Sequence, residues 1–295
     1  MIQVGTCSWA EKSLIQSGEF YPKTVRTAES RLKFYTERFN VVEVDSTYYA
    51  IPTKSNAFLW ADRTPKGFVF HIKAYGVLTG HAVDPRTLPP DILNELQEKD
   101  KRQKQVYVTE RHLVNMIADK FIEALYPLAS TNKLGVIVFQ FPPWFIYKSE
   151  NLDFILARRD LMGRYRMAVE FRHGSWYAPD VREKVFHFLR KNQIIHVVAD
   201  EPQYGTLATV PFIPQTTSDM AYFRLHGRNK ENWLKKGIET SLRYAYEYSD
   251  EELKEFISHI QTSAKMAKET FVMFNNCHGA YAMRNAERMK ILLKG

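Results

Sequence analysis

Eight short apolar runs recur along the chain, and most of them are followed by a helical pattern of apolar residues. The runs have the period of two that is typical of β-strands, and nearly all end in a charged or amide residue. Alternating strand and helix signals predict parallel strands joined by helical crossovers, and eight such units predict an α/β fold of the (β/α)8 TIM-barrel type. The predicted strands are Ile2–Cys7, Val41–Asp45, Phe68–Lys73, Gly135–Gln140, Met167–Arg172, Ile194–Asp200, Met220–His226 and Thr270–Asn275.

Side chains two positions apart on a strand share a face, so each predicted strand can be divided into an inward and an outward set. Glu43 and Asp45 share one face of their strand, opposite to Val42 and Val44. The same rule assigns to the barrel interior His71 with Lys73, Val138 with Gln140, Glu170 with Arg172, His196 and Val198 with Asp200, and Arg224 with His226. It assigns to the helical layer Ile137, Phe139, Val197, Ala199, Phe223 and Leu225.

The composition fits one barrel domain that spans residues 1–295. With 45% hydrophobic residues the chain can bury a large core. It has no apolar run of about 18 residues and begins with a strand pattern rather than a signal segment, so we expect a cytoplasmic protein that does not enter a membrane. The net charge of +8 alone does not exclude nucleic acid, but the basic residues are dispersed and no nucleic-acid motif is present. We therefore expect a small-molecule ligand.

Two cysteines are too few for a disulfide framework. Cys7 ends the first predicted strand and Cys277 follows the last, and these strands are neighbours in a closed barrel. We interpret them as two reduced thiols, with a redox pair as the alternative.

Several sequence blocks, taken together, identify a family. The chain resembles the YecE-like family, or domain of unknown function 72, from end to end. The resemblance implies a TIM-barrel fold and no established activity. Similar sequences commonly carry Asn where this chain has Asp45, so charge arguments at that position are specific to this chain. The blocks are Gly5–Trp9, Phe20–Pro22, Val42–Tyr49 with Pro52, Phe68–Lys73, Phe139–Pro143, Val169–His173 with Ser175 and Trp176, Arg224–Asn229, and Phe274–Asn276.

The carboxyl ends of barrel strands converge on one mouth, so the polar residues at the strand ends predict a charged pocket. Four carboxylates, Glu43, Asp45, Glu170 and Asp200, are expected there with three cations, Lys73, Arg172 and Arg224. A desolvated site does not tolerate an unpaired charge, so either His226 is protonated, or one carboxyl keeps its proton, or a cation is bound. The first two states suit a general acid.

We expect an enzyme of the hydrolase, lyase or isomerase class that uses general acid–base chemistry on a small polar substrate, anionic or sugar-like. Glu170 is the first choice for proton transfer because Arg172 fixes its position without occupying both oxygens. Glu43 faces it across the mouth, as in a glycosidase pair. The candidate catalytic residues are Glu43, Glu170, His226, Asp200 and Asn275. The candidate substrate-binding residues are Trp9, Asp45, Tyr48, Lys73, Gln140, Arg172, Trp176, Arg224, Arg228 and Gly279.

The loops after the last two strands suggest an anion site. Gly227, Arg228 and Gly279 stand near the predicted final helix Ala280–Leu293, whose free N–H groups could bind a phosphate. Long connections, Ala74–Arg111, Glu201–Asp219 and Gly227–Asp250, are expected to cover the mouth.

Two alternatives stay open. The same mouth could bind or sense an acidic metabolite without turnover. A divalent cation such as Mg²⁺ or Mn²⁺ could use the carboxylates with His226 and Asn275 in a hydrolase or isomerase. Because Arg172 and Arg224 would repel a cation, we favour a site without a required cofactor and assign no metal ligands.

Overall fold

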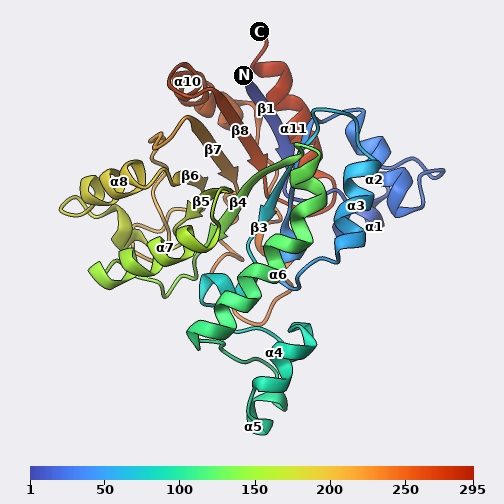
Figure 1. Cartoon of the computed structure of the whole chain (residues 1–295). Coiled ribbons are helices and arrows are strands. Elements are labelled where there is room, and N and C mark those ends of the chain that lie inside the picture. The colour runs from blue at the N-terminus through green and yellow to red at the C-terminus, as the bar shows by residue number, and fades with distance from the viewer.

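The computed structural model describes residues 1–295, and its eight strands close into one parallel barrel in sequence order (Figure 1). The (β/α)8 prediction is therefore confirmed. All eight predicted strands are present, with ends that differ by at most two residues. They are β1 Ile2–Thr6, β2 Val41–Val44, β3 Val69–Lys73, β4 Leu134–Gln140, β5 Arg166–Glu170, β6 Ile195–Asp200, β7 Met220–Leu225 and β8 Glu269–Phe274.

Helices surround the barrel, and the two termini lie together at one end of it (Figure 1). None of the helices is both long and apolar enough to cross a membrane. The helices are α1 Lys12–Ser17, α2 Ala28–Thr36, α3 Lys54–Asp62, α4 Pro90–Glu95, α5 Glu98–Lys101, α6 Arg111–Ser130, α7 Ser149–Leu161, α8 Arg182–Lys191, α9 Thr240–Arg243, α10 Asp250–Met266 and α11 Tyr281–Leu292. Four 3-10 turns follow strands or lie in loops: Asp45–Tyr48, Gly76–Thr79, Pro85–Thr87 and Gly174–Tyr177.

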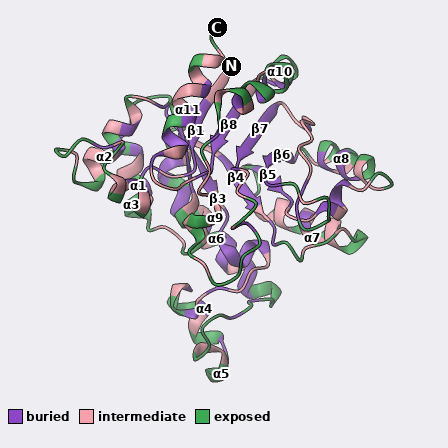
Figure 2. Ribbon diagram, turned by 180° about the vertical axis from the view of Figure 1, so that it is seen from behind, coloured by how far each residue is buried: buried purple, intermediate pink, exposed green.

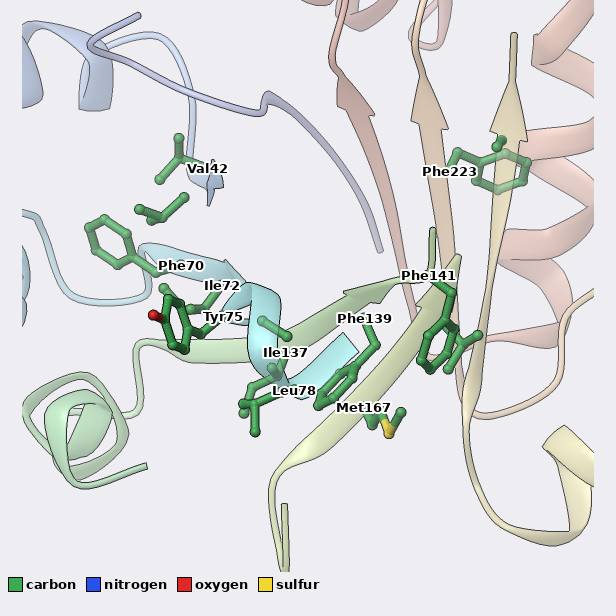
Figure 3. Packing of buried hydrophobic residues seen from close by; sticks show 14 of the residues in the cluster. Val42, Phe70, Ile72, Tyr75, Leu78, Ile137, Phe139, Phe141, Met167 and Phe223 are labelled. Carbon is green, nitrogen blue, oxygen red and sulfur yellow. The ribbon is translucent and has the colours of Figure 1, made fainter. Parts of the chain in front are cut away.

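The apolar side chains form two separate layers, one on each face of the barrel wall. The large cluster lies between the strands and the helices and includes Val42, Phe70 and Ile137, which Figure 3 shows on the outer face. A smaller cluster fills the interior and includes Val138 and Tyr222. This division matches the alternation in the sequence for β2, β3, β4, β5, β7 and β8. Strands appear as the buried centre of the fold in Figure 2.

The prediction for β6 is wrong. The interior cluster contains Ile195 and Val197, whereas Val198 belongs to the outer cluster. His196 packs against Phe186 of α8, with ring centroids 5.0 Å apart, so it also faces outward. The inward face of this strand therefore leads to Glu201, one residue beyond Asp200.

Side chains pack closely inside the barrel, below the polar residues at the ends of the strands. A Cβ at position 135 would lie 2.4 Å from Nδ1 of His71, so only glycine leaves room for that ring. His71 Nδ1 accepts a hydrogen bond from the Val136 N–H at 3.0 Å, and its ring contacts Tyr222 and Phe271 edge-on. Tyr222 is thereby held under the polar mouth.

The connection between β3 and β4 leaves the barrel and carries α4 and α5, which project from the rest of the fold at the end opposite to the termini (Figures 1 and 2). An isolated antiparallel bridge between Val83 and Val106 closes the base of this projection. The strands run away from the N-terminal end, so the projection stands on the side of their carboxyl ends.

Candidate active site

Arg224 is the centre of a buried network at the carboxyl ends of the strands. Its side chain is completely buried. Nη2 donates to Glu43 Oε1 at 2.6 Å and lies 3.3 Å from Asp45 Oδ1, and Nη1 donates to Glu170 Oε2. Three carboxyl groups from β2, the turn after it and β5 therefore surround one guanidinium from β7. Sequence parity had placed all four on the inward face.

Glu170 is a fixed anion. Its Oε1 accepts from Gln140 Nε2 at 2.7 Å, from His226 Nε2 at 3.0 Å and from Arg172 Nη1 at 3.1 Å, while its Oε2 accepts from Arg224. Burial alone would raise the pKa of Glu170, but the neighbouring Arg224, His226 and Arg172 hold it well below its usual range. Both oxygens are occupied, contrary to the expectation that made Glu170 the first choice for proton transfer.

His226 is a neutral imidazole with a defined tautomer. Its Nε2 lies 3.0 Å from Glu170 Oε1, and its Nδ1 lies 2.9 Å from the side-chain nitrogen of Asn275. Because a carboxylate accepts and an amide nitrogen donates, Nε2 carries the hydrogen and Nδ1 accepts. Burial lowers the pKa of His226 to about 4, against the opposing effect of Glu170.

Glu43 and Asp45 form a carboxyl pair with opposite pKa shifts. Burial raises the pKa of Glu43 to about 8, although Arg224 opposes the shift and the charge of Asp45 adds to it. Burial would also raise the pKa of Asp45, but Lys73, Arg224 and a hydrogen bond with Glu43 lower it. Glu43 is fully buried, whereas the Asp45 side chain is 25% exposed. At neutral pH the proton therefore stays on Glu43, and Asp45 is the carboxylate that is accessible from the mouth of the barrel.

The set of charged residues at the mouth differs from the predicted set by one carboxyl group. Glu201, rather than Asp200, pairs with Arg172 at 3.1 Å, and its other oxygen accepts from the Val210 N–H at 2.7 Å. Burial raises the pKa of Glu201 to about 7. Of the three states allowed by the sequence, the arrangement favours the one in which a carboxyl keeps its proton, and Glu43 holds it.

A cavity of about 400 Å³ lies above the network. Lys73 stands on its wall with its ammonium 4.9 Å from the ring centroid of Tyr48, and no carboxylate forms an ion pair with it. Thr240, Ser241 and Tyr244 come from the long loop after β7, so that loop covers the mouth as expected. Five predicted site residues line this cavity: Asp45, Tyr48, Lys73, Gln140 and Asn275.

Two predicted aromatic contacts belong to the outer core instead. Trp9 is 8% exposed and packs edge-on against Trp60 and Phe70, with ring centroids 5.9 and 6.2 Å apart. Trp176 is completely buried, stacks on Phe171 at 4.2 Å and donates to the Phe145 carbonyl at 2.6 Å. Neither lines the cavity, so the structure does not place them where they could stack on a ligand in it. Their rings are large apolar surfaces that stabilise the helical layer.

Asp200 and Arg228 lie outside the mouth. Arg228 Nε donates to Asp200 Oδ2 at 3.1 Å, and Tyr248 donates its hydroxyl hydrogen to the same oxygen at 2.6 Å. The Arg228 guanidinium also lies 3.4 Å from Glu252 and 3.0 Å from Glu255, both on α10. The structure places these two residues away from the cavity over the network, because Asp200 is on the outward face of β6 and Arg228 contacts three carboxylates.

The two glycines of the predicted phosphate site after β7 and β8 have their N–H groups bound within the protein. The Gly279 N–H donates to Ser13 Oγ at 2.9 Å, and the Gly227 N–H donates to the Tyr248 hydroxyl at 2.7 Å. Helix α11 begins at Tyr281, one residue later than predicted. These two N–H groups are therefore not free to bind an anion.

The two cysteines are free and both adjoin the cavity. Cys7 Sγ lies 3.8 Å from Arg224 Nη2, and the Cys277 thiol points to the Phe274 carbonyl at 3.8 Å. Burial raises the pKa of each thiol. They are therefore protonated at neutral pH and do not act as thiolates.

Several residues of the site were missed by sequence reasoning. Tyr222 donates its hydroxyl hydrogen to Glu43 Oε2 at 2.7 Å. It shares a face with Arg224 and His226, so the parity rule would have found it if aromatic residues had been considered along with charged ones. Glu201 was missed because β6 was assigned the wrong face. The other missed residues line the cavity: Ser8, Ala10, Glu11, Ser46 and Tyr49, with Thr240, Ser241 and Tyr244 from the covering loop.

The carboxylates of the mouth are arranged around a guanidinium rather than around a metal position. Arg224 lies between Glu43, Asp45 and Glu170 and neutralises the oxygens that a hard cation would need. No group of three or more His, Cys, Asp or Glu side chains has a geometry that could hold a metal ion. The same guanidinium separates Glu43 from Glu170, so a sugar bond has no room between them and the glycosidase pair is not supported.

Comparison with known proteins gives a consistent result along the whole chain. A family model described as "Protein of unknown function DUF72" matches residues 3–295. A Bacillus subtilis protein named "UPF0759 protein YunF" is 32% identical over 296 residues, which cover 99% of this chain and 95% of that protein.

Solved structures of DUF72 family proteins also match the whole chain. The crystal structure of a DUF72 family protein from Thermotoga maritima has a TM-score of 0.78 and 31% identity, with full coverage of both chains. A DUF72 family protein from Enterococcus faecalis V583 has a TM-score of 0.81 and 28% identity, and the match covers 100% of this chain and 96% of that chain.

Proposed function

Because this chain belongs to the DUF72 family, whose description assigns no function, we propose its activity from the site itself: general acid–base catalysis on a small anionic molecule in the cavity between Asp45 and Lys73. The observation that carries the proposal is the carboxyl pair of Glu43 and Asp45. Their environments drive the two pKa values apart, which is the usual arrangement of an acid and a base that operate together at neutral pH.

The proton path has two steps. Asp45 is the only member of the pair on the cavity wall, so it exchanges protons with the substrate. Glu43 lies behind it, and Arg224 Nη2 contacts both carboxyl groups, at 2.6 Å from Glu43 Oε1 and 3.3 Å from Asp45 Oδ1. Glu43 first transfers its proton to the Asp45 carboxylate and becomes a carboxylate that Arg224 and Tyr222 stabilise, and Asp45 then gives that proton to the substrate. In the reverse direction Asp45 is the base.

The rest of the cavity suits an oxyanion. Lys73 has no carboxylate partner and can bind a negative oxygen of the substrate. The Asn275 and Gln140 side chains also stand on the wall, and their amide nitrogens are held by His226 and Glu170. Their positions are fixed before a substrate arrives, which lowers the cost of ordering the site. Proton transfer beside an anionic oxygen is the chemistry of isomerases and lyases.

The test uses proton exchange, so the substrate need not be known in advance. Small anionic metabolites would be incubated with the protein in deuterated water and followed by NMR for deuterium uptake or conversion. For a molecule that reacts, we expect E43Q and D45N each to reduce the rate by about a hundredfold or more. E183Q removes an exposed carboxyl on α8 and should react at the parental rate. Tight binding of a metabolite without deuterium exchange would instead support the alternative that the protein binds or senses a metabolite without turnover.

A further inference from the structure

A second cavity adjoins the first and differs from it in charge. It has a volume of about 350 Å³ and shares two wall residues, Gln140 and Tyr244, with the cavity over Asp45. No carboxylate lines it. Its basic residues are Arg172, Lys236 and Arg243, and its apolar wall includes Trp233 and Phe141. The two cavities are thus neighbouring halves of one mouth, one with the carboxyl pair and one with an excess of positive charge.

The three cations of this second cavity are not equivalent. Arg172 is neutralised by Glu170 and Glu201, each at 3.1 Å, and its guanidinium lies over the Trp233 ring at 5.0 Å. Arg243 Nη2 donates to the Lys235 carbonyl at 2.9 Å and its Nε is buried without a partner. Neither Arg243 nor Lys236 forms an ion pair with a carboxylate. Two uncompensated positive charges therefore remain for a ligand.

The loop that carries these cations is held in place. Asn229 Nδ2 donates to the carbonyls of Leu242 and Ala245, at 3.2 and 2.9 Å, on either side of Arg243. Farther along, Asn276 Nδ2 donates to the Tyr246 carbonyl at 2.8 Å. These hydrogen bonds fix the backbone around α9, so the Arg243 side chain begins from a defined position.

We propose that the second cavity binds a phosphate group carried by the substrate, beyond the part that reacts at Asp45. The inference rests on the proposed function for the identity of the reacting half. Arg presents paired N–H donors that match phosphate oxygens, and Lys adds a point charge, so the two together favour a phosphate over a singly charged carboxylate. The substrate class is a two-part phosphorylated metabolite. Binding of its phosphate would position the reacting part over the carboxyl pair.

The first experiment measures inorganic phosphate binding by calorimetry. We expect binding to the parental protein, a loss of at least tenfold in affinity for R243Q, and an unchanged affinity for K235Q, which removes a neighbouring exposed charge of the same loop. E43Q should bind phosphate like the parental protein. Loss of binding in K73Q but not in R243Q would place the anion in the first cavity and overturn the inference, as would malonate binding as tight as that of phosphate.

A second experiment separates this inference from the proposed function. In the deuterium exchange assay, phosphorylated metabolites would be compared with their dephosphorylated forms. We expect R243Q to reduce the preference for the phosphorylated form by raising its KM, while E43Q reduces exchange of both forms alike. If no metabolite exchanges but phosphate binding depends on Arg243, the subsite stands and the acid–base function fails. If exchange shows no preference for phosphorylated forms, the subsite is overturned and the function stands.

Discussion

Arg224 on β7 donates from Nη2 to Glu43 Oε1 on β2 at 2.6 Å, and both side chains are completely buried inside the barrel. The contact joins strands on different sides of the barrel through its interior. The Arg224 guanidinium is charged and has no access to water, and a buried charge is stable only while it keeps its partners. The mouth is therefore a single electrostatic unit, and replacement of one member affects the others.

Replacement of Arg224 by Leu should destabilise the fold. Asp45 and Glu170 would lose their common counter-charge in a desolvated site, and we expect the free energy of unfolding to fall by roughly 2–5 kcal/mol. Urea unfolding at neutral pH measures this change. Arg182 on α8 is a matched control because it is 41% exposed and pairs only with Glu183 at 3.6 Å. R182L should change stability by less than about 0.5 kcal/mol, and equal effects of the two changes would show that Arg224 is solvated.

The two buried glutamates should respond differently to the same substitution. Glu43 keeps its proton at neutral pH, so Gln is a close substitute, and E43Q should change stability by less than about 1 kcal/mol. Glu170 is a carboxylate with three cationic or imidazole partners, so E170Q should cost roughly 3–5 kcal/mol. Urea unfolding of both variants at pH 7 makes the comparison. A larger loss for E43Q than for E170Q would contradict the assigned protonation states.

Stability should fall as the pH rises from about 6.5 to 8. The pKa of Glu43 is raised to about 8 from an unfolded value near 4.5, so the folded protein binds more protons than the unfolded chain over this range. Glu201, raised to about 7, acts in the same direction. Below pH 6.5 the lowered pKa of His226, about 4, acts in the opposite direction, because the unfolded histidine takes up the proton.

The measurement is the free energy of unfolding at several pH values across that window. E43Q should make the decrease in the free energy of unfolding with rising pH smaller, and the E43Q/E201Q double variant should remove most of this decrease. A parental protein whose stability is constant or rises between pH 6.5 and 8 would show that Glu43 is already ionised.

The strand pattern was enough to predict the barrel and most of the mouth, because the alternation in six strands agrees with the two faces of the barrel wall. The segment from Ile195 to Asp200 is different. Both of its faces are apolar apart from His196 and Asp200, which share the outward face. Alternation alone cannot assign such a strand, and the polar residues led to the wrong side. Their polarity is satisfied instead by Tyr177, Tyr248 and Arg228 in the outer layer.

Other features depend on contacts that no local pattern contains. The hydrogen bonds from Trp176 to the Phe145 carbonyl and from Gly279 to Ser13 join distant parts of the chain. The number of donors around Glu170 was also not predictable, because Gln140 comes from β4 whereas Arg224 and His226 come from the end of β7. Strand parity indicates which side chains share the barrel interior, but the distances between them were needed to identify which carboxyl group can act as the acid.

Replacement of Tyr222 by Phe should raise the pKa of Glu43 further. The hydroxyl hydrogen bond to Oε2, at 2.7 Å, favours the ionised carboxylate, and its loss favours the protonated form. The variant should also lose about 1–3 kcal/mol of stability, because a buried oxygen would be left without its donor. The decrease in stability with rising pH should then extend to a higher pH than in the parental protein. Tyr126 is 53% exposed, so Y126F is the control and should change neither property. If the decrease in the free energy of unfolding moves to lower pH in Y222F, Tyr222 stabilises the protonated form of Glu43. The proposed proton transfer from Glu43 to Asp45 would then have to be reversed.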